Sequence, residues 1–234
     1  MIDWLQTPLS GSGEHSIAPW AFWHARVMVL GWGILLPAGA LLARFYKVTR
    51  SQSWPAELDS KVWWYGHLAL QYVGVALVSV GVVLSWNQGA QVSLAGKLHA
   101  WAGWGLFTAA WVQVAAGWLR GSKGGPTDST LRGDHYDMTR RRLVFEHLHK
   151  SLGWLAVLVA VGVLISGLLL VDAPRWMLVV LGVWWLVMAG TFAVLQKRGQ
   201  VVDTYQAIWG PDSIHPGNRG PLTGLGASRR RDKQ

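Results

Sequence analysis

The chain has 234 residues, of which 51% are hydrophobic and only 14% are charged, and it contains seventeen Trp. Soluble domains carry about 25% charged residues, so this composition excludes an ordinary soluble domain and predicts a membrane protein. The net charge of +9 suggests nucleic-acid binding at first sight, but its distribution along the chain indicates membrane topology instead. The absence of Cys excludes disulfides and thiolate metal sites.

Residues 1–19 are polar and rich in Gly and Ser, and we expect them to form an external segment before the first helix. They lack the basic start and cleavage site of a removable signal peptide, so the first apolar stretch is expected to remain as a helix. Five apolar stretches follow, each near the roughly twenty residues that a helix needs to cross a bilayer. They run over residues 22–43, 63–86, 98–119, 149–171 and 176–195.

Backbone amides inside lipid must be hydrogen-bonded within the protein, and none of the five stretches has the alternating pattern of a barrel strand. The sequence therefore predicts an all-α integral membrane protein with five transmembrane helices. We expect the transmembrane domain to cover residues 20–196. Residues 197–234 are expected to form a basic cytoplasmic tail, either as a surface extension or, with its more hydrophobic patch at residues 205–211, packed under the bundle. A loop that is Gly-rich at Gly121–Gly125 and basic at Arg140–Arg142 joins the third and fourth stretches.

The positive charges are strongly asymmetric across these five stretches. Eighteen of the twenty-one Lys and Arg residues fall on one side, and the other side has only Arg26, Lys97 and Arg175. Cytoplasmic loops carry the excess of positive charge, so we expect the N-terminus outside and the C-terminus in the cytoplasm. The expected location is the plasma (inner) membrane.

Four histidines, His24, His67, His99 and His149, stand near the starts of four successive apolar stretches. Any one of them alone reads equally well as an interfacial histidine at a helix end. Ionisable residues at membrane depth are costly and usually mark a site with a partner, so four in matching positions favour a ligand-binding site.

Topology decides which of these histidines can meet. Successive helices run in opposite directions, so neighbours such as His24 and His67 would be separated by about 25 Å at helical rise. We therefore expect His24 to pair with His99 towards the outside, and His67 with His149 towards the cytoplasm. This arrangement predicts a four-helix core and one peripheral helix.

Small residues follow each histidine at a regular spacing, as a wedged cofactor would require. Gly31 and Gly74 come seven residues after their histidines, and Gly103 and Gly153 come four residues after theirs. Each expected pair thus combines one helix with the seven-residue spacing and one with the four-residue spacing. Glycine is also common in membrane helices generally.

Two imidazoles fill both axial positions of a haem iron, which leaves electron transfer as the chemistry of such a centre. Without Cys, two haem b groups would be held non-covalently. Arg26 and Lys97 outside, and Lys61 or Lys150 inside, are candidate partners of haem propionates, although each reads as well as an interfacial anchor.

His147 competes with His149, but residues two apart on a helix differ by about 200°, so only one of them can face a given haem. We expect His149 to be the ligand, because it lies deeper in the apolar stretch and has Gly153 one turn later.

At these positions residues 20–195 resemble the cytochrome b561 family, particularly the form found fused to, or working beside, DOMON domains. The motifs that carry the resemblance are His24-Ala-Arg-Val-Met28, Pro37-Ala-Gly39, Ala43-Arg44, Trp64-Tyr65-Gly66-His67, Gln71, His99-Ala-Trp-Ala-Gly103, Gln113, Gly117, Arg120 and His149-Lys-Ser-Leu-Gly153. The resemblance implies two b haems and transmembrane electron transfer, often from ascorbate in eukaryotic members.

The donor is left open between ascorbate, a quinone and a separate redox protein. The expected class is a transmembrane electron-transfer oxidoreductase, for which an ascorbate- or quinol-linked reductase is one of the alternatives. A homodimer within membrane lipid is a further expectation, and no nucleic-acid partner is expected. The alternatives are a cytochrome b anchor subunit of a larger redox complex, a histidine-based metal-ion site or transporter, and a scaffold without cofactor. The metal alternative is weaker, because the apolar stretches lack the acidic or sulfur-rich paths that ion passage requires.

Overall fold

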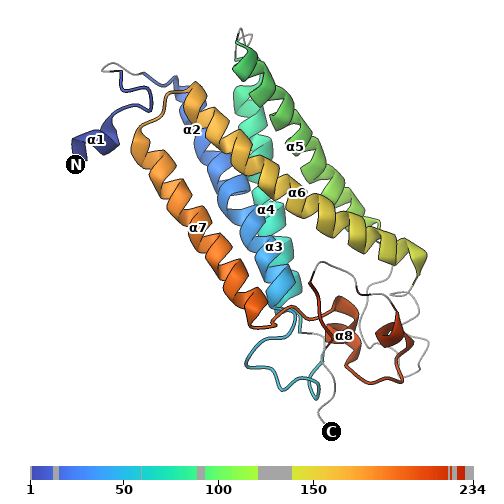
Figure 1. Ribbon diagram of the computed structural model, residues 1–234. Helices are drawn as coiled ribbons and strands as arrows, with labels where there is room; N and C mark the ends of the chain where they lie inside the picture. Colours follow the sequence, from blue (N-terminus) through green and yellow to red (C-terminus); the bar gives the residue numbers. More distant parts are fainter. Residues whose placement is uncertain are drawn as a thin grey trace. The chain divides into compact units, whose positions relative to one another are not determined.

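A computed structural model describes residues 2–12, 16–58, 60–88, 93–120, 139–220, 222 and 226–229, and the statements below concern these residues. The described part of the chain is helical and contains no β-strand, only two isolated bridges, as the predicted all-α class requires (Figure 1). The elements are α1 (Ile2–Gln6), α2 (Pro19–Met28), the π-helical η1 (Val29–Leu35), α3 (Leu36–Phe45), α4 (Val62–Ser85), α5 (Leu94–Trp118), α6 (Arg140–Leu170), α7 (Arg175–Lys197), α8 (Thr204–Trp209) and the 3-10 turn η3 (Pro216–Arg219).

Four helical segments in the described residues are long and apolar enough to cross a membrane: Pro19–Phe45, Val62–Ser85, Arg140–Leu170 and Arg175–Lys197. The protein is therefore a multi-pass membrane protein. Helix α5 has 25 residues, which is ample length, but its many Trp and Gly residues and its polar side chains make it less apolar than the other four. The predicted fifth span thus exists as a helix, and its crossing of the membrane stays a prediction.

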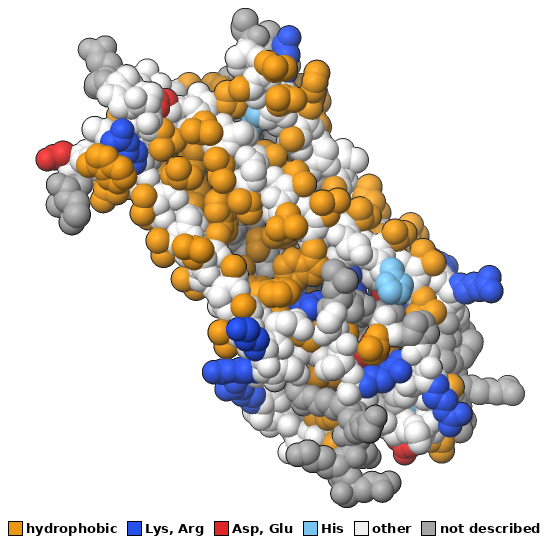
Figure 2. Space-filling model, viewed as in Figure 1, with side chains coloured by type: hydrophobic (Ala, Val, Ile, Leu, Met, Phe, Trp, Pro, Cys, Tyr) orange, Lys and Arg blue, Asp and Glu red, His pale blue; other side chains and the backbone are white. Residues whose placement is uncertain are grey.

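The long helices expose large apolar side chains over much of their length. Leu158, Val183 and Leu186 are among the most exposed, with 56–73% of their surface accessible. Figure 2 shows orange apolar side chains covering much of the face it presents. Apolar patches of this extent are rare on soluble monomers, and in a membrane protein they face lipid tails.

The first spanning segment changes its helical pitch around a proline. Pro37 has no N–H, so it cannot donate to the carbonyl of Gly33 four residues earlier. The seven residues of η1 immediately before it take the wider π turn. The indole Nε1 of Trp184 on α7 donates to the Gly33 oxygen at 3.0 Å, which supplies a donor that the proline cannot.

Helix α6 begins at Arg140, nine residues before the start that hydropathy predicts. The extra turns are polar and are joined along one face of the helix. The carboxylate of Glu146 lies 3.2 Å from Arg142 and 2.5 Å from Lys150, each four residues away. Such pairs stabilise a helix through sequence that an apolar pattern does not identify.

The chain divides into two compact units. The first comprises Met1–Ala38, Leu70–Trp111 and Leu155–Gly190, and the second comprises Gly39–Ala69, Val112–Trp154 and Thr191–Gln234. In the first unit Leu168, Ala173 and Leu181 form a buried cluster at the α6–α7 connection. In the second unit Phe45 is 1% exposed, and its ring meets that of Phe192 edge to face at 5.3 Å.

In its described residues the tail is a folded part of the second unit. The sequence favoured a surface extension and left packing as the alternative. Val201, Val202, Ile208 and Trp209 are all buried. Asp203 caps α8 by accepting hydrogen bonds from the backbone N–H groups of Tyr205 and Gln206. The apolar Tyr205–Trp209 stretch explains the burial, because it gives this short helix a surface to pack. The Gly121–Gly125 stretch and the basic end of the tail lie outside the described residues, as do His15 and His135.

We predict that Trp184→Phe lowers the free energy of unfolding by about 1 kcal/mol, because it removes the donor to the Gly33 oxygen. In a Pro37→Ala background the same change should cost less, because residue 37 then has an N–H for that carbonyl. Reversible unfolding in detergent of the wild type, the two single variants and the double variant measures the coupling free energy between residues 37 and 184. An equal cost of Trp184→Phe in both backgrounds would contradict this account of the π segment.

Candidate functional site

The first histidine pair lies within the first unit. His24 on α2 and His99 on α5 have ring centroids 6.4 Å apart and ring planes at 66°. The Nδ1 atom of His24 lies 2.8 Å from the carbonyl oxygen of Gly81 on α4. A carbonyl can only accept, so this Nδ1 carries the proton, and Nε2 is left without one.

His99 is held in the same tautomer by a hydroxyl group. Its Nδ1 lies 2.9 Å from Oγ of Ser166 on α6, and that hydroxyl donates its only proton to the carbonyl of Val163 at 2.8 Å. The Nδ1 of His99 must then donate to Ser166. Gly167 makes room for the ring, because a Cβ there would lie 3.0 Å from Cε1 of His99.

The second pair lies within the second unit. His67 on α4 and His149 on α6 have ring centroids 6.2 Å apart and ring planes at 75°. The Nδ1 of His67 donates to the carbonyl of Gly39 at 3.0 Å. The carbonyl of His149 accepts from Nε2 of Gln113 at 2.8 Å, which ties the backbone of α6 to α5 at this turn.

The ring of His149 is positioned by packing rather than by a hydrogen bond. It stacks on Phe145, with centroids 5.0 Å apart and planes at 29°. Its Nδ1 is buried and has no hydrogen-bond partner among the described residues. Three of the four imidazoles therefore have an acceptor for Nδ1, and His149 does not.

Both pairs fit a metal that needs only two ligands from the protein. A metal bound axially by two imidazole nitrogens at about 2 Å each would hold the ring centroids roughly 6 Å apart. No group of three or more His, Asp or Glu side chains that could hold a metal occurs among the described residues. Zinc sites use three or four protein ligands, whereas a porphyrin supplies four of the six ligands of its iron.

The four glycines singled out in the sequence have different surroundings. A Cβ on Gly31 would lie 2.8 Å from Val78 and 3.1 Å from the Gly74 oxygen, so these two glycines permit the close approach of η1 and α4. Nothing lies within 4 Å of a Cβ on Gly103, and a Cβ on Gly153 would lie 3.1 Å from the Gln113 amide. Contact of any of the four with a haem stays a prediction.

The cationic candidates also remain predictions as propionate partners. Arg26 is exposed and its guanidinium lies 3.2 Å above the Phe22 ring, a cation–π contact. Lys97 and Lys61 are exposed, and so is His147, the competitor of His149. Lys150 belongs instead to a polar cluster in the second unit.

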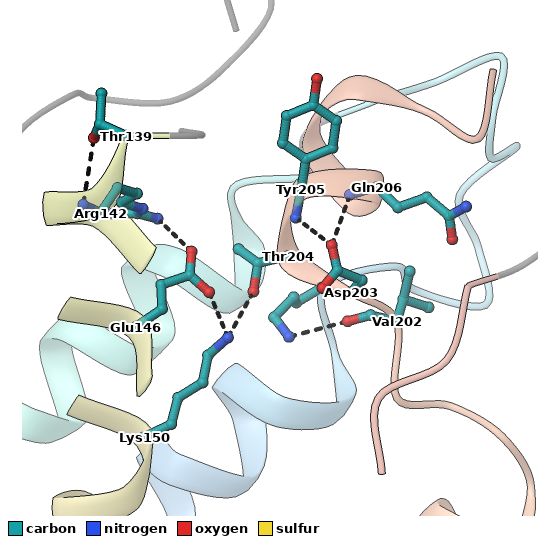
Figure 3. Close-up of polar contacts among 10 residues, drawn as sticks. Thr139, Arg142, Glu146, Lys150, Val202, Asp203, Thr204, Tyr205 and Gln206 are labelled. Carbon is teal, nitrogen blue, oxygen red and sulfur yellow. Dashed lines mark hydrogen bonds and ion pairs between the residues drawn. The ribbon is translucent and has the colours of Figure 1, made fainter. Parts of the chain in front are cut away.

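This polar cluster joins α6 to the start of α8 (Figure 3). Lys150 points toward Glu146 and Thr204, with its Nζ 2.5 Å from the carboxylate and 3.3 Å from the hydroxyl. Lys47, just after α3, donates to the carbonyl of Val202 at 3.1 Å and is buried. The cluster begins one turn before His149 and holds the folded tail against α6.

Several site residues were not identified from the sequence. Ser166 and Gly167 sit in the middle of an apolar stretch, where small residues are common, and Phe145 lies in the polar turns before it. The acceptors of His24 and His67 are the backbone carbonyls of Gly81 and Gly39. Every residue type has such a carbonyl, so the sequence does not mark these positions as acceptors. A usable signal was the hydroxyl of Ser166 itself, because a polar group at membrane depth needs a partner.

Comparison with known proteins finds cytochrome b561 sequences. Residues 23–123 match the family model of eukaryotic cytochrome b561, a range that contains His24, His67 and His99 and stops before His149. A cytochrome b561, DM13 and DOMON domain-containing protein of Arabidopsis thaliana is 30% identical over 159 residues, 68% of this chain and 16% of that protein. Two cytochrome b561 and DOMON domain-containing proteins of the same plant are each 35% identical, one over 40% of this chain and 22% of its own length, the other over 42% and 23%.

The chain thus spans less than a quarter of the length of these curated relatives. No solved structure matches it.

We predict that the unfolding free energy rises between about pH 7 and pH 10 because of Lys47. Burial, reinforced by the nearby charge of Lys150, lowers the pKa of Lys47 from 10.5 to about 7. Between these values the unfolded chain binds a proton that the folded chain does not, so stability increases with pH, and the penalty is present in full below pH 7. Lys47→Met should abolish this rise in denaturation measured at pH 6 and pH 9. The same pH dependence in the variant would contradict the assignment.

Proposed function

We propose, since the chain belongs to the cytochrome b561 family, that it carries electrons across a membrane through two b-type haems. In this proposal His24 and His99 bind one haem iron, towards the outside, and His67 and His149 bind the other, towards the cytoplasm. The family membership supports haem binding and electron transfer in general. The number of haems and their ligands are proposed from the side chains of this chain.

The observation that carries the proposal is the geometry of the two imidazole pairs. Each pair has ring centroids just over 6 Å apart, near the separation that two axial imidazoles would have. In three of the four rings Nδ1 is committed to an acceptor, which leaves Nε2 for a metal. An imidazole ligand whose other nitrogen donates to a fixed acceptor is the usual arrangement at metal sites.

A haem iron with two imidazole ligands exchanges single electrons and has no open position for oxygen or substrate. The residues of this chain would then have two tasks. The carbonyls of Gly39 and Gly81 and the hydroxyl of Ser166 fix the orientation of three rings, so little rearrangement accompanies a change of charge. The apolar helices keep water from the rings and so lower the local dielectric constant.

Transmembrane transfer is supported by the distribution of the pairs and of the charges. One pair belongs to each compact unit, and alternate helices supply each pair. We propose five spans, with α5 as the fifth, an external N-terminus and a cytoplasmic C-terminus in the plasma (inner) membrane. The excess of Lys and Arg in the segments assigned to the cytoplasm supports this orientation.

The electron donor is proposed only as a class. Ascorbate, a quinol and a separate redox protein all remain candidates, and the names of the relatives join b561 with DOMON domains. Arg26 and Lys97 are proposed to pair with propionates of the outer haem, and a homodimer in lipid is proposed for the assembly. A zinc or copper transport site is less well supported, because each pair provides only two imidazoles.

Haem content of variants tests the proposal. The purified protein should contain two haems per chain in a pyridine assay, with a b-type reduced-minus-oxidised spectrum. His99→Ala should lose one haem and His149→Ala the other, because each removes an axial ligand from a different site. His147→Ala is the matched control and should retain both haems.

Two double variants check that the two losses concern different sites. The double variant His99→Ala, His149→Ala should contain no haem, whereas His24→Ala, His99→Ala should keep one. Loss of the same haem by His99→Ala and His149→Ala would contradict the pairing. A protein without haem after expression with ample haem supply would contradict the proposed function itself.

A further inference from the structure

The two histidine pairs differ in the number of hydrogen bonds that their Nδ1 atoms make. In the first pair His24 donates to the Gly81 carbonyl and His99 donates to the Ser166 hydroxyl. In the second pair only His67 has an acceptor, the Gly39 carbonyl, while the buried Nδ1 of His149 has none among the described residues. The first pair thus makes two Nδ1 hydrogen bonds, and the second pair makes one.

This difference has an electronic consequence for a metal on Nε2. An N–H donating to an acceptor makes the imidazole more basic and therefore a stronger donor to the metal. A stronger donor stabilises the ferric state more than the ferrous state, and hydrogen bonding around the ligands is one of the protein's means of setting a haem potential. A ring without an acceptor leaves its iron easier to reduce.

The Ser166 hydroxyl acts on His99 as one link in a chain. Its own proton is taken by the Val163 carbonyl at 2.8 Å, so its oxygen is free to accept from the imidazole. Hydrogen bonds in such a chain polarise one another in a low-dielectric interior. The backbone carbonyl of Val163 also interacts with His99 directly, so Ser166 and Val163 act together on this ring.

We propose that these contacts set the two haems at different reduction potentials, with the haem of His67 and His149 the easier to reduce and Ser166 holding the other lower. Ser166 is then a positioning residue that acts on the iron through His99. The inference rests on the proposed function, since it assumes that each pair binds a haem. It assigns an order of reduction to the two sites.

The test is a potentiometric titration of the reduced b-type absorbance in the purified two-haem protein. The His99→Ala and His149→Ala variants, each retaining one haem, assign the two components. We expect the His67/His149 haem to be reduced first. Ser166→Ala should then increase the reduction equilibrium constant of the His24/His99 haem by up to tenfold, about 59 mV for one electron, and leave the other haem unchanged.

Two further serine variants control for the loss of a hydroxyl and for disruption of the helix. Ser166→Thr keeps an acceptor and should restore the wild-type potential. Ser79 on α4 donates to the Val75 carbonyl at 2.8 Å in the same way as Ser166 but has no histidine partner, so Ser79→Ala should change neither potential. The ferric low-spin EPR spectrum of Ser166→Ala should change for one haem only.

The wild-type titration alone is informative if Ser166→Ala fails to fold. Equal potentials, or a lower potential for the His67/His149 haem, would overturn this inference while leaving the electron-transfer function intact. An unchanged potential in a folded Ser166→Ala protein would also overturn it. A protein that binds no haem would overturn both the inference and the proposed function.

Discussion

The hydrogen bond from a buried imidazole Nδ1 to an acceptor on another helix is the interaction on which the site depends. A polar group at membrane depth is costly unless it is paired, and the carbonyls of Gly39 and Gly81 provide that pairing for His67 and His24. One bond thus satisfies the N–H, fixes the tautomer and leaves Nε2 without a proton. The contacts that pack the helices together therefore also position the histidine ligands.

Glycine residues contribute both to the packing of the helices and to the positioning of the ligands. At Gly31 a Cβ would meet the backbone oxygen of Gly74, and at Gly74 a Cβ would meet the side chain of Leu36, so the absence of both side chains lets the first spanning segment and α4 approach closely. Gly167 leaves space for the His99 ring next to its acceptor, Ser166. In membranes, where lipid tails give no hydrophobic drive for helices to associate, such close contacts supply much of the packing energy.

Much of the fold could be predicted from hydropathy and charge, because the lengths of membrane helices are dictated by the bilayer. The helix at 62–85 lies within one residue of the predicted 63–86 stretch. The start of α6 was missed by nine residues, since the ion pairs of Glu146 extend the helix into polar sequence that hydropathy leaves out. The packing of the tail was only an alternative to a surface extension, because α8 is held by a side-chain cap and by packing, which no periodicity in six residues can indicate.

The pairing of the histidines followed from the alternation of helix direction, but their acceptors did not. Backbone carbonyls carry no residue-specific signal, and Ser166 is one of several small residues within an apolar stretch. The lack of a partner for Nδ1 of His149 among the described residues is even harder to predict from sequence, because it depends on every neighbouring side chain. Such details are what distinguish two sites that have identical ligands.

The most direct measurement of the central claim is electron transfer across a vesicle wall by the purified protein. Lipid vesicles that contain the two-haem protein and entrapped ferricyanide would receive a membrane-impermeant reductant on the outside. The account predicts that entrapped ferricyanide is reduced in these vesicles, and not in empty vesicles or in vesicles with His99→Ala. No reduction by a protein with two haems per chain, or an equal rate with His99→Ala, would contradict it.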